Sequence, residues 1–174
     1  IKDLFKAGAD IVQLDEPYMQ ARPDKAADFA IEAINKAVAG VSGTTALHMC
    51  FGYAHIYASS GLEKETSYAF LEQLNRCDID QISIEAAQPK LDLIILKELP
   101  NKTIILGVID NGDLKVESPE TVANRIDSAL RYVDLKRLVL APDCGMKYMD
   151  RDIAFAKLSA LSLGASLVRD RLNM

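Results

Sequence analysis

The stretch Lys102-Thr103-Ile104-Ile105-Leu106-Gly107-Val108-Ile109-Asp110 is almost continuously apolar between its two charged ends. An apolar run of this length, too short for a typical helix, predicts a strand that is buried on both faces. Strands of that kind belong to parallel sheets, which helices cover on their faces. The stretch therefore predicts an α/β fold.

The same pattern recurs on both sides of this stretch. Four further apolar runs predict strands, and helical spacing or helix-start signals such as Ser118-Pro119-Glu120 predict helices between them. The expected strands are 9–14, 44–50, 81–87 and 137–142, and the expected helices are 24–38, 66–76, 91–99, 118–133 and 150–163, with an initial helix that ends before Gly8. Five strands that alternate with helices predict a parallel sheet.

Composition narrows the functional classes. The chain has 174 residues, which is typical of one domain, with 49% hydrophobic and 26% charged residues. A net charge of -5 and the absence of a basic stripe argue against a nucleic-acid partner. No apolar run approaches the roughly 20 residues of a membrane span. The first residue is not methionine, so we expect the chain to begin inside a longer protein.

The cysteines indicate a reducing compartment. There are three of them, Cys50, Cys77 and Cys144, and no export signal precedes them. An odd number of cysteines in a chain of this kind favours free thiols, metal ligands or nucleophiles over disulfides. We therefore expect a cytoplasmic protein. Cys77 lies at the end of a predicted helix without a partner, and we interpret it as structural.

Ionisable and polar residues gather at one position in each predicted strand–helix unit, namely where the strand ends. They are Asp15, Glu16, His48, Cys50, Glu85, Asp110, Asp143 and Cys144. In a parallel sheet or barrel, the carboxyl ends of the strands share one face, and that face carries the chemistry. The sequence thus predicts a functional site on this rim.

Four of these residues form a plausible ligand set for zinc. His48 and Cys50 are two residues apart on one strand, so their side chains point to the same side. Glu85 and Cys144 add a carboxylate and a second sulfur. Two sulfurs, one nitrogen and one oxygen suit tetrahedral zinc, whereas thiolates make magnesium and calcium poor candidates. Spacing alone leaves open that each residue is an ordinary core or surface residue.

The motifs also resemble a known family as an ordered set. They are Val12-Gln13-Leu14-Asp15-Glu16-Pro17, His48-Met49-Cys50, Ile84-Glu85, Gly107-Val108-Ile109-Asp110 and Ala141-Pro142-Asp143-Cys144-Gly145. Their order and spacing resemble the catalytic domain of cobalamin-independent methionine synthase over nearly the whole chain. The resemblance implies a (β/α)8 TIM barrel, of which residues 1–174 hold roughly the last five βα units, with no second domain. A five-stranded arc leaves two open edges, so we expect a fragment or a fold completed by another chain.

The resemblance also implies roles for residues. It implies that Zn²⁺ is held by His48, Cys50, Glu85 and Cys144, and that Asp15 holds the amino group of homocysteine. From the chemistry of the ligands, we expect the catalytic ligand Glu85 to be the one most easily displaced by the substrate. From its position after the same strand, we expect Glu16 to lie in the substrate site as well. From the residues alone, a carboxylate at either position can instead cap the next helix or loop, an alternative that is stronger for Glu16 than for Asp15. The implied reaction transfers a methyl group from methyltetrahydrofolate, or a related donor, to the thiol of homocysteine to form methionine.

Two departures from the family keep the donor and the proton transfer open. The family has a histidine shortly after the Val-X-Asp strand, but here Asp110 is followed by Asn111-Gly112-Asp113. The stretch 116–120 is more similar to short, single-barrel members, whose donor need not be a polyglutamylated folate. A methyl-cobalamin protein is an alternative donor. Alternatives are alkyl transfer to another thiol, as in an epoxyalkane:coenzyme M transferase, and a non-catalytic zinc-stabilised domain. Asp15 argues against coenzyme M, which has no amino group.

The remaining polar residues near the rim have two interpretations each. Asp110 and Asp143 either orient the ligands or stabilise turns. His55 either contacts the substrate or is a loop histidine without chemistry. Phe51 and Tyr53 either stack on a planar donor or pack beside the site.

Overall fold

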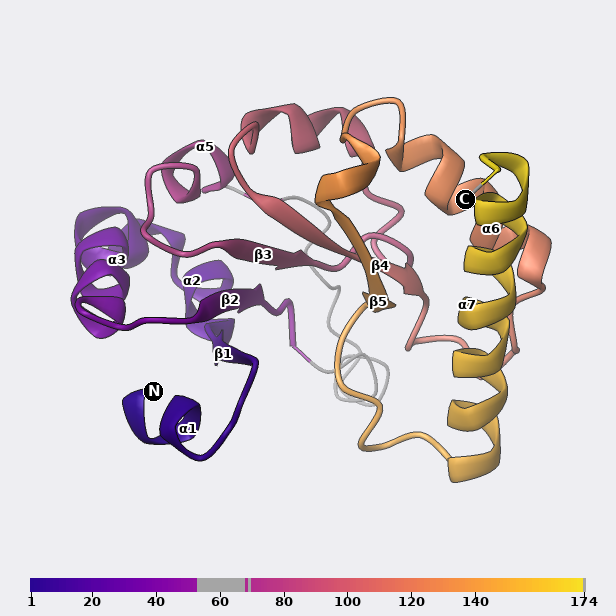
Figure 1. Cartoon of the computed structure of the whole chain (residues 1–174), viewed down its shortest axis with the longest axis horizontal. Coiled ribbons are helices and arrows are strands. Elements are labelled where there is room, and N and C mark those ends of the chain that lie inside the picture. The colour runs from indigo at the N-terminus through magenta and orange to yellow at the C-terminus, as the bar shows by residue number, and fades with distance from the viewer. Residues whose placement is uncertain (53–67, 69, 174) are drawn as a thin grey trace.

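In the computed structural model, which describes residues 1–52, 68 and 70–173, five parallel strands form one sheet in the order β1-β2-β3-β4-β5 (Figure 1). The strands are β1 (Ile11–Asp15), β2 (Thr44–Met49), β3 (Gln81–Ile84), β4 (Thr103–Ile109) and β5 (Leu138–Pro142). Each strand pairs with its successor in the chain, as expected when a helical connection returns the chain to the start of the next parallel strand.

Among the described residues, helical segments precede, connect and follow the strands, and the longer ones lie outside the arc that the sheet forms (Figure 1). They are α1 (Lys2–Lys6), α2 (Pro17–Ala21), α3 (Pro23–Val38), α5 (Leu71–Leu74), η1 (Leu93–Glu98), α6 (Pro119–Ala129), η2 (Leu135–Arg137) and α7 (Arg151–Arg171). The predicted α/β fold of the (β/α)8 barrel type is confirmed, with five βα units among the described residues. Among the helices of the described ranges, none is long and apolar enough to cross a membrane.

The core lies between the outer face of the sheet and the helices. On β4, Ile104, Leu106 and Val108 are fully or almost fully buried, as are Ile82 and Ile84 on β3. Alternate residues of a strand point to opposite faces. The intervening side chains, such as Ile105, therefore line the inner, concave face of the arc, where Ile105 borders a cavity.

Several predicted helix boundaries were wrong. The helix expected at 150–163 continues through Gly164 to Arg171. Gly164 lies where this helix packs closely on α6, since a Cβ there would lie 2.6 Å from Val122. The segment expected at 91–99 forms a 3-10 helix, and the helix expected at 66–76 is limited to Leu71–Leu74 within the described residues. Helix α2, with Pro17 in its first turn, was not predicted.

Candidate metal centre

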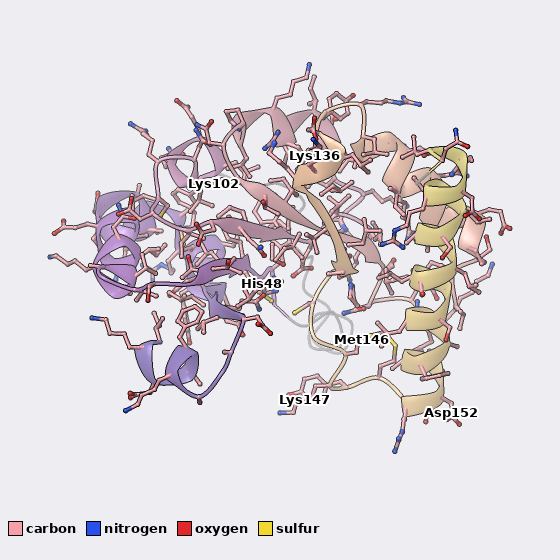
Figure 2. All side chains as sticks on the ribbon, viewed as in Figure 1. His48, Lys102, Lys136, Met146, Lys147 and Asp152 are labelled. Atoms are coloured by element: carbon pink, nitrogen blue, oxygen red, sulfur yellow. The ribbon has the colours of Figure 1, made fainter. Side chains whose placement is uncertain are left out.

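Four side chains from three strand ends converge on the rim of the sheet. His48 lies near the end of β2 and Cys50 just beyond it, Glu85 directly follows β3, and Cys144 follows β5. One ligand atom from each residue lies within 4.8 Å of the others. His48, Cys50 and Glu85 are buried, and Cys144 is half-buried. In Figure 2 the side chain of His48 lies on the inner side of the arc of strands.

A hydrogen bond orients the imidazole of His48. Its Nδ1 lies 2.8 Å from the Oγ of Ser83 on β3. The other nitrogen, Nε2, is buried without a hydrogen-bond partner among the described residues. A histidine that donates from Nδ1 to a neighbouring oxygen presents a lone pair on Nε2, which is the usual arrangement of a metal-bound histidine. The unsatisfied nitrogen is thus positioned to act as a ligand.

The two thiols of the centre are in contact. The sulfurs of Cys50 and Cys144 lie 3.4 Å apart, and both are free cysteines. The contact with Cys144 is the largest cause of a raised pKa of Cys50, and burial is the next. Two thiols this close together cannot both ionise without a compensating positive charge. A cation bound between the sulfurs would supply that charge, so the donor set fits a soft divalent metal such as zinc.

The charged groups around the proposed metal centre also favour a bound cation. Burial by itself lowers the pKa of His48, but contact with Cys50 and the negative charges of Cys50, Glu85 and Asp15 outweigh it, so the pKa is raised. Glu85 is fully buried, and its Oε1 accepts a hydrogen bond of 2.9 Å from the backbone N–H of Phe51. A buried carboxylate beside two thiols is costly unless a cation pairs with it.

Asp143 positions the loop that carries Glu85. Its two oxygens accept hydrogen bonds from the backbone N–H groups of Ala86, Ala87 and Gln88, at 2.9, 2.9 and 2.6 Å. Burial raises the pKa of Asp143 to about 6, although these N–H groups oppose the rise. The side chain crosses β4 at Gly107, where a Cβ would lie 2.1 Å from its Oδ1. Asp110, in contrast, accepts from the N–H of Gly112 at 2.7 Å, which is the turn role.

The two carboxylates after β1 occupy different environments. Asp15 is exposed and accepts a hydrogen bond of 2.8 Å from Gln13. Asp15 lines a cavity of about 570 Å³ together with His48, Cys50 and Cys144. Glu16 is not among the described residues that line this cavity; it borders a separate groove beside α2 and α3. The structure therefore brings Asp15, but not Glu16, to the centre.

Two residues near the centre were not predicted from the sequence, and two that the sequence singled out lie outside the described residues. Ser83 was missed, although it interrupts an apolar strand two residues before Glu85, on the same face. Tyr68 was also missed, and its position in the sequence gives no signal of its contacts with the strand ends. Phe51 packs against Tyr68, with ring centroids 4.4 Å apart. His55 and Tyr53 lie outside the described residues.

Comparison with known proteins identifies the family. Residues 1–166 match the family model described as the catalytic domain of cobalamin-independent synthase. The chain belongs to the cobalamin-independent methionine synthase family.

Individual relatives agree with this assignment. The methionine synthases of Thermococcus kodakarensis and Pyrococcus horikoshii are 37% and 35% identical to this chain over 98% and 99% of its length. A solved B12-independent methionine synthase from Shewanella sp. W3-18-1, in complex with selenomethionine, is 30% identical, with a TM-score of 0.89 over 98% of this chain and 52% of that one. The chain spans about half the length of the two curated relatives, covering 47% of each.

Proposed function

We propose that this chain is the metal-binding portion of a zinc-dependent methyltransferase that methylates the thiol of homocysteine to form methionine. The observation that carries the proposal is the convergence of His48, Cys50, Glu85 and Cys144, whose ligand atoms lie within 4.8 Å of one another on the catalytic rim of a parallel sheet. The methyl donor is methyltetrahydrofolate or a related carrier.

The donor set suits alkyl transfer to sulfur. When bound, zinc would keep the substrate sulfur as a thiolate at neutral pH. The two thiols and the carboxylate of Cys50, Cys144 and Glu85 carry more negative charge, when ionised, than one zinc ion carries positive charge. Such an anionic centre leaves a bound sulfur electron-rich, which favours attack on a methyl group over activation of water. Glu85 is the ligand that we expect the substrate sulfur to displace.

The barrel itself is completed by further strands in this proposal. Residues 1–174 would form the C-terminal portion of one (β/α)8 barrel, in which the end strands of the described sheet, β1 and β5, pair with further strands. Apolar grooves lie beside both, one against α2 and α3 and the other between β5 and α7. Ile11 and Val139, on these end strands, are 49% and 43% exposed. Apolar surface of this kind is expected to be covered by the other strands and helices of the barrel.

Asp15 is the proposed receptor for the substrate ammonium group. Replacing it with asparagine removes the charge, and a hydrogen bond to a charged group is worth about 1.5–3 kcal/mol, so we expect the KM for homocysteine to rise about 10–100-fold. Zinc content should not change. Asp10→Asn, just before β1 and at the opposite end of the strand, is the matched control and should leave KM unchanged. An unaltered KM in Asp15→Asn would remove this residue from the substrate site.

A spectroscopic titration tests the proposed function. The complete protein is loaded with Co²⁺ in place of zinc, and homocysteine is added while the visible absorption bands are recorded. Because the substrate sulfur is expected to replace Glu85, the bands should shift and the thiolate-to-cobalt absorption should increase. A structural site is closed to exchange. A spectrum that stays the same at saturating homocysteine would therefore support a non-catalytic zinc site instead.

A further inference from the structure

The strand ends on the rim share one hydrogen-bonding rule. In a parallel ladder, when two residues on neighbouring strands are paired, the residue that follows one of them donates its N–H to the carbonyl of the other. Asp15 pairs with His48, and Glu16 N–H donates to the carbonyl of His48 at 3.0 Å. At the β4–β5 end, Ile109 pairs with Pro142, and the N–H of Asp143 donates to the carbonyl of Ile109 at 3.0 Å.

The β2–β3 end is built differently. Its last pair is Met49 with Ile84, so the rule calls for a bond from the N–H of Glu85 to the carbonyl of Met49. The hydroxyl of Tyr68 lies between these two groups. It accepts a hydrogen bond of 2.8 Å from the N–H of Glu85 and donates one of 3.1 Å to the carbonyl of Met49. A side-chain oxygen thus takes the place of the direct link between the strands.

The inserted hydroxyl bonds to the backbone of one proposed ligand, Glu85, and of Met49, which lies between two others. Met49 separates His48 from Cys50, and Glu85 is itself a proposed ligand. Neighbouring strands normally lie about 4.8 Å apart, and an oxygen bonded to both backbones widens that gap locally. Just beyond this end of the ladder, Phe51 donates its N–H to Oε1 of Glu85 at 2.9 Å. The ring of Phe51 then packs on that of Tyr68.

We propose that Tyr68 is a positioning residue of the metal centre: its hydroxyl separates the ends of β2 and β3 and thereby sets the distance between Cys50 and Glu85. This inference rests on the proposed metal centre. At the β1–β2 and β4–β5 ends a direct backbone hydrogen bond links the two strands, whereas at the β2–β3 end the hydroxyl of Tyr68 links them. The burial of the phenol raises its pKa well above the ordinary value, so it remains a neutral donor.

The test removes one oxygen atom. Tyr68→Phe keeps the ring and its contact with Phe51 but leaves the carbonyl of Met49 and the N–H of Glu85 without the bridge. We expect zinc affinity, measured by competition with a chromophoric chelator, to fall about 10–100-fold, as for other residues that orient metal ligands. The Co²⁺ spectrum should also change, because the carboxylate moves relative to the sulfurs. Tyr132→Phe is the matched control, since Tyr132 follows α6 and contacts Lys97 instead.

The outcomes separate this inference from the proposed function. Wild-type zinc affinity and an unchanged Co²⁺ spectrum in Tyr68→Phe would overturn the role of Tyr68. If the wild-type protein itself binds no zinc, the proposed function fails first. A further measurement needs no variant: the amide of Glu85 in the wild-type protein should exchange with deuterium slowly, because it donates to the hydroxyl. Exchange at the rate of an unprotected amide would also overturn the inference.

Discussion

Replacing Cys144 with serine is expected to abolish stoichiometric zinc binding. The sulfur of Cys144 lies 3.4 Å from that of Cys50, and the proposed tetrahedral set needs both thiolates. A serine hydroxyl stays protonated at neutral pH and is a poor ligand for a soft metal, so three donors would remain. The measurement is the metal content of the purified protein by atomic emission, reported as zinc per chain.

Cys77→Ser is the matched control for this variant. Cys77 is also buried, and burial raises its pKa to about 11, but it lies between α5 and β3, away from the rim. The control should retain one zinc per chain. One zinc per chain in Cys144→Ser would exclude Cys144 from the ligand set and would require a different fourth donor.

A buried ion pair between Lys157 and Glu117 is expected to contribute strongly to the free energy of unfolding. Lys157 of α7 is completely buried, and its Nζ lies 2.8 Å from Oε2 of Glu117. The same nitrogen donates to the carbonyls of Asp110 and Lys115 at 3.0 and 2.8 Å. The other oxygen of Glu117 accepts from Arg125 at 3.2 Å. These contacts tie the loop after β4 to helices α6 and α7.

Glu117→Gln is expected to lower the free energy of unfolding by about 3–5 kcal/mol at pH 7, because the charge of Lys157 stays buried without its anion. Urea denaturation followed by circular dichroism provides the measurement. Glu98→Gln, at the exposed end of η1, is the control and should change the free energy by less than about 0.5 kcal/mol. A loss as small as that of the control would show that a neutral amide oxygen satisfies Lys157 as well as the carboxylate does.

The pair also predicts the direction of a pH effect. Burial alone raises the pKa of Glu117, but the hydrogen bonds from Lys157 and from the N–H of Asp110 outweigh it, so the pKa is lowered from its ordinary value of 4.5. A carboxyl with a lowered folded-state pKa stabilises the fold above pH 4.5 and loses that contribution as the pH falls through the folded-state pKa. The stability gap between wild type and Glu117→Gln should therefore narrow in acid.

The residues on the rim could be predicted from the sequence, but the contacts that hold the rim in place could not. Strand runs such as 102–110 are strongly apolar, and parallel strands end on one face, so His48, Cys50, Glu85 and Cys144 were predicted to meet. Their role as zinc ligands remains a prediction. The contacts of Tyr68 and Lys157 depend on how distant segments pack, and local sequence patterns do not predict such long-range contacts. Gly164 shows the same limit, since a glycine that permits helix packing looks like a helix end in the sequence.

The metal donors lie far apart in the chain but close together in space. Cys50 and Cys144 are separated by 94 residues, and strands β3, β4 and β5 all lie between them. An ion held by both sulfurs would close a long loop, and holding that loop closed in an unfolded chain is entropically costly. Such an ion therefore favours the folded state and shifts the folding equilibrium by mass action. Metal binding and folding are thus expected to be thermodynamically linked, and chelation should lower the melting temperature of the protein.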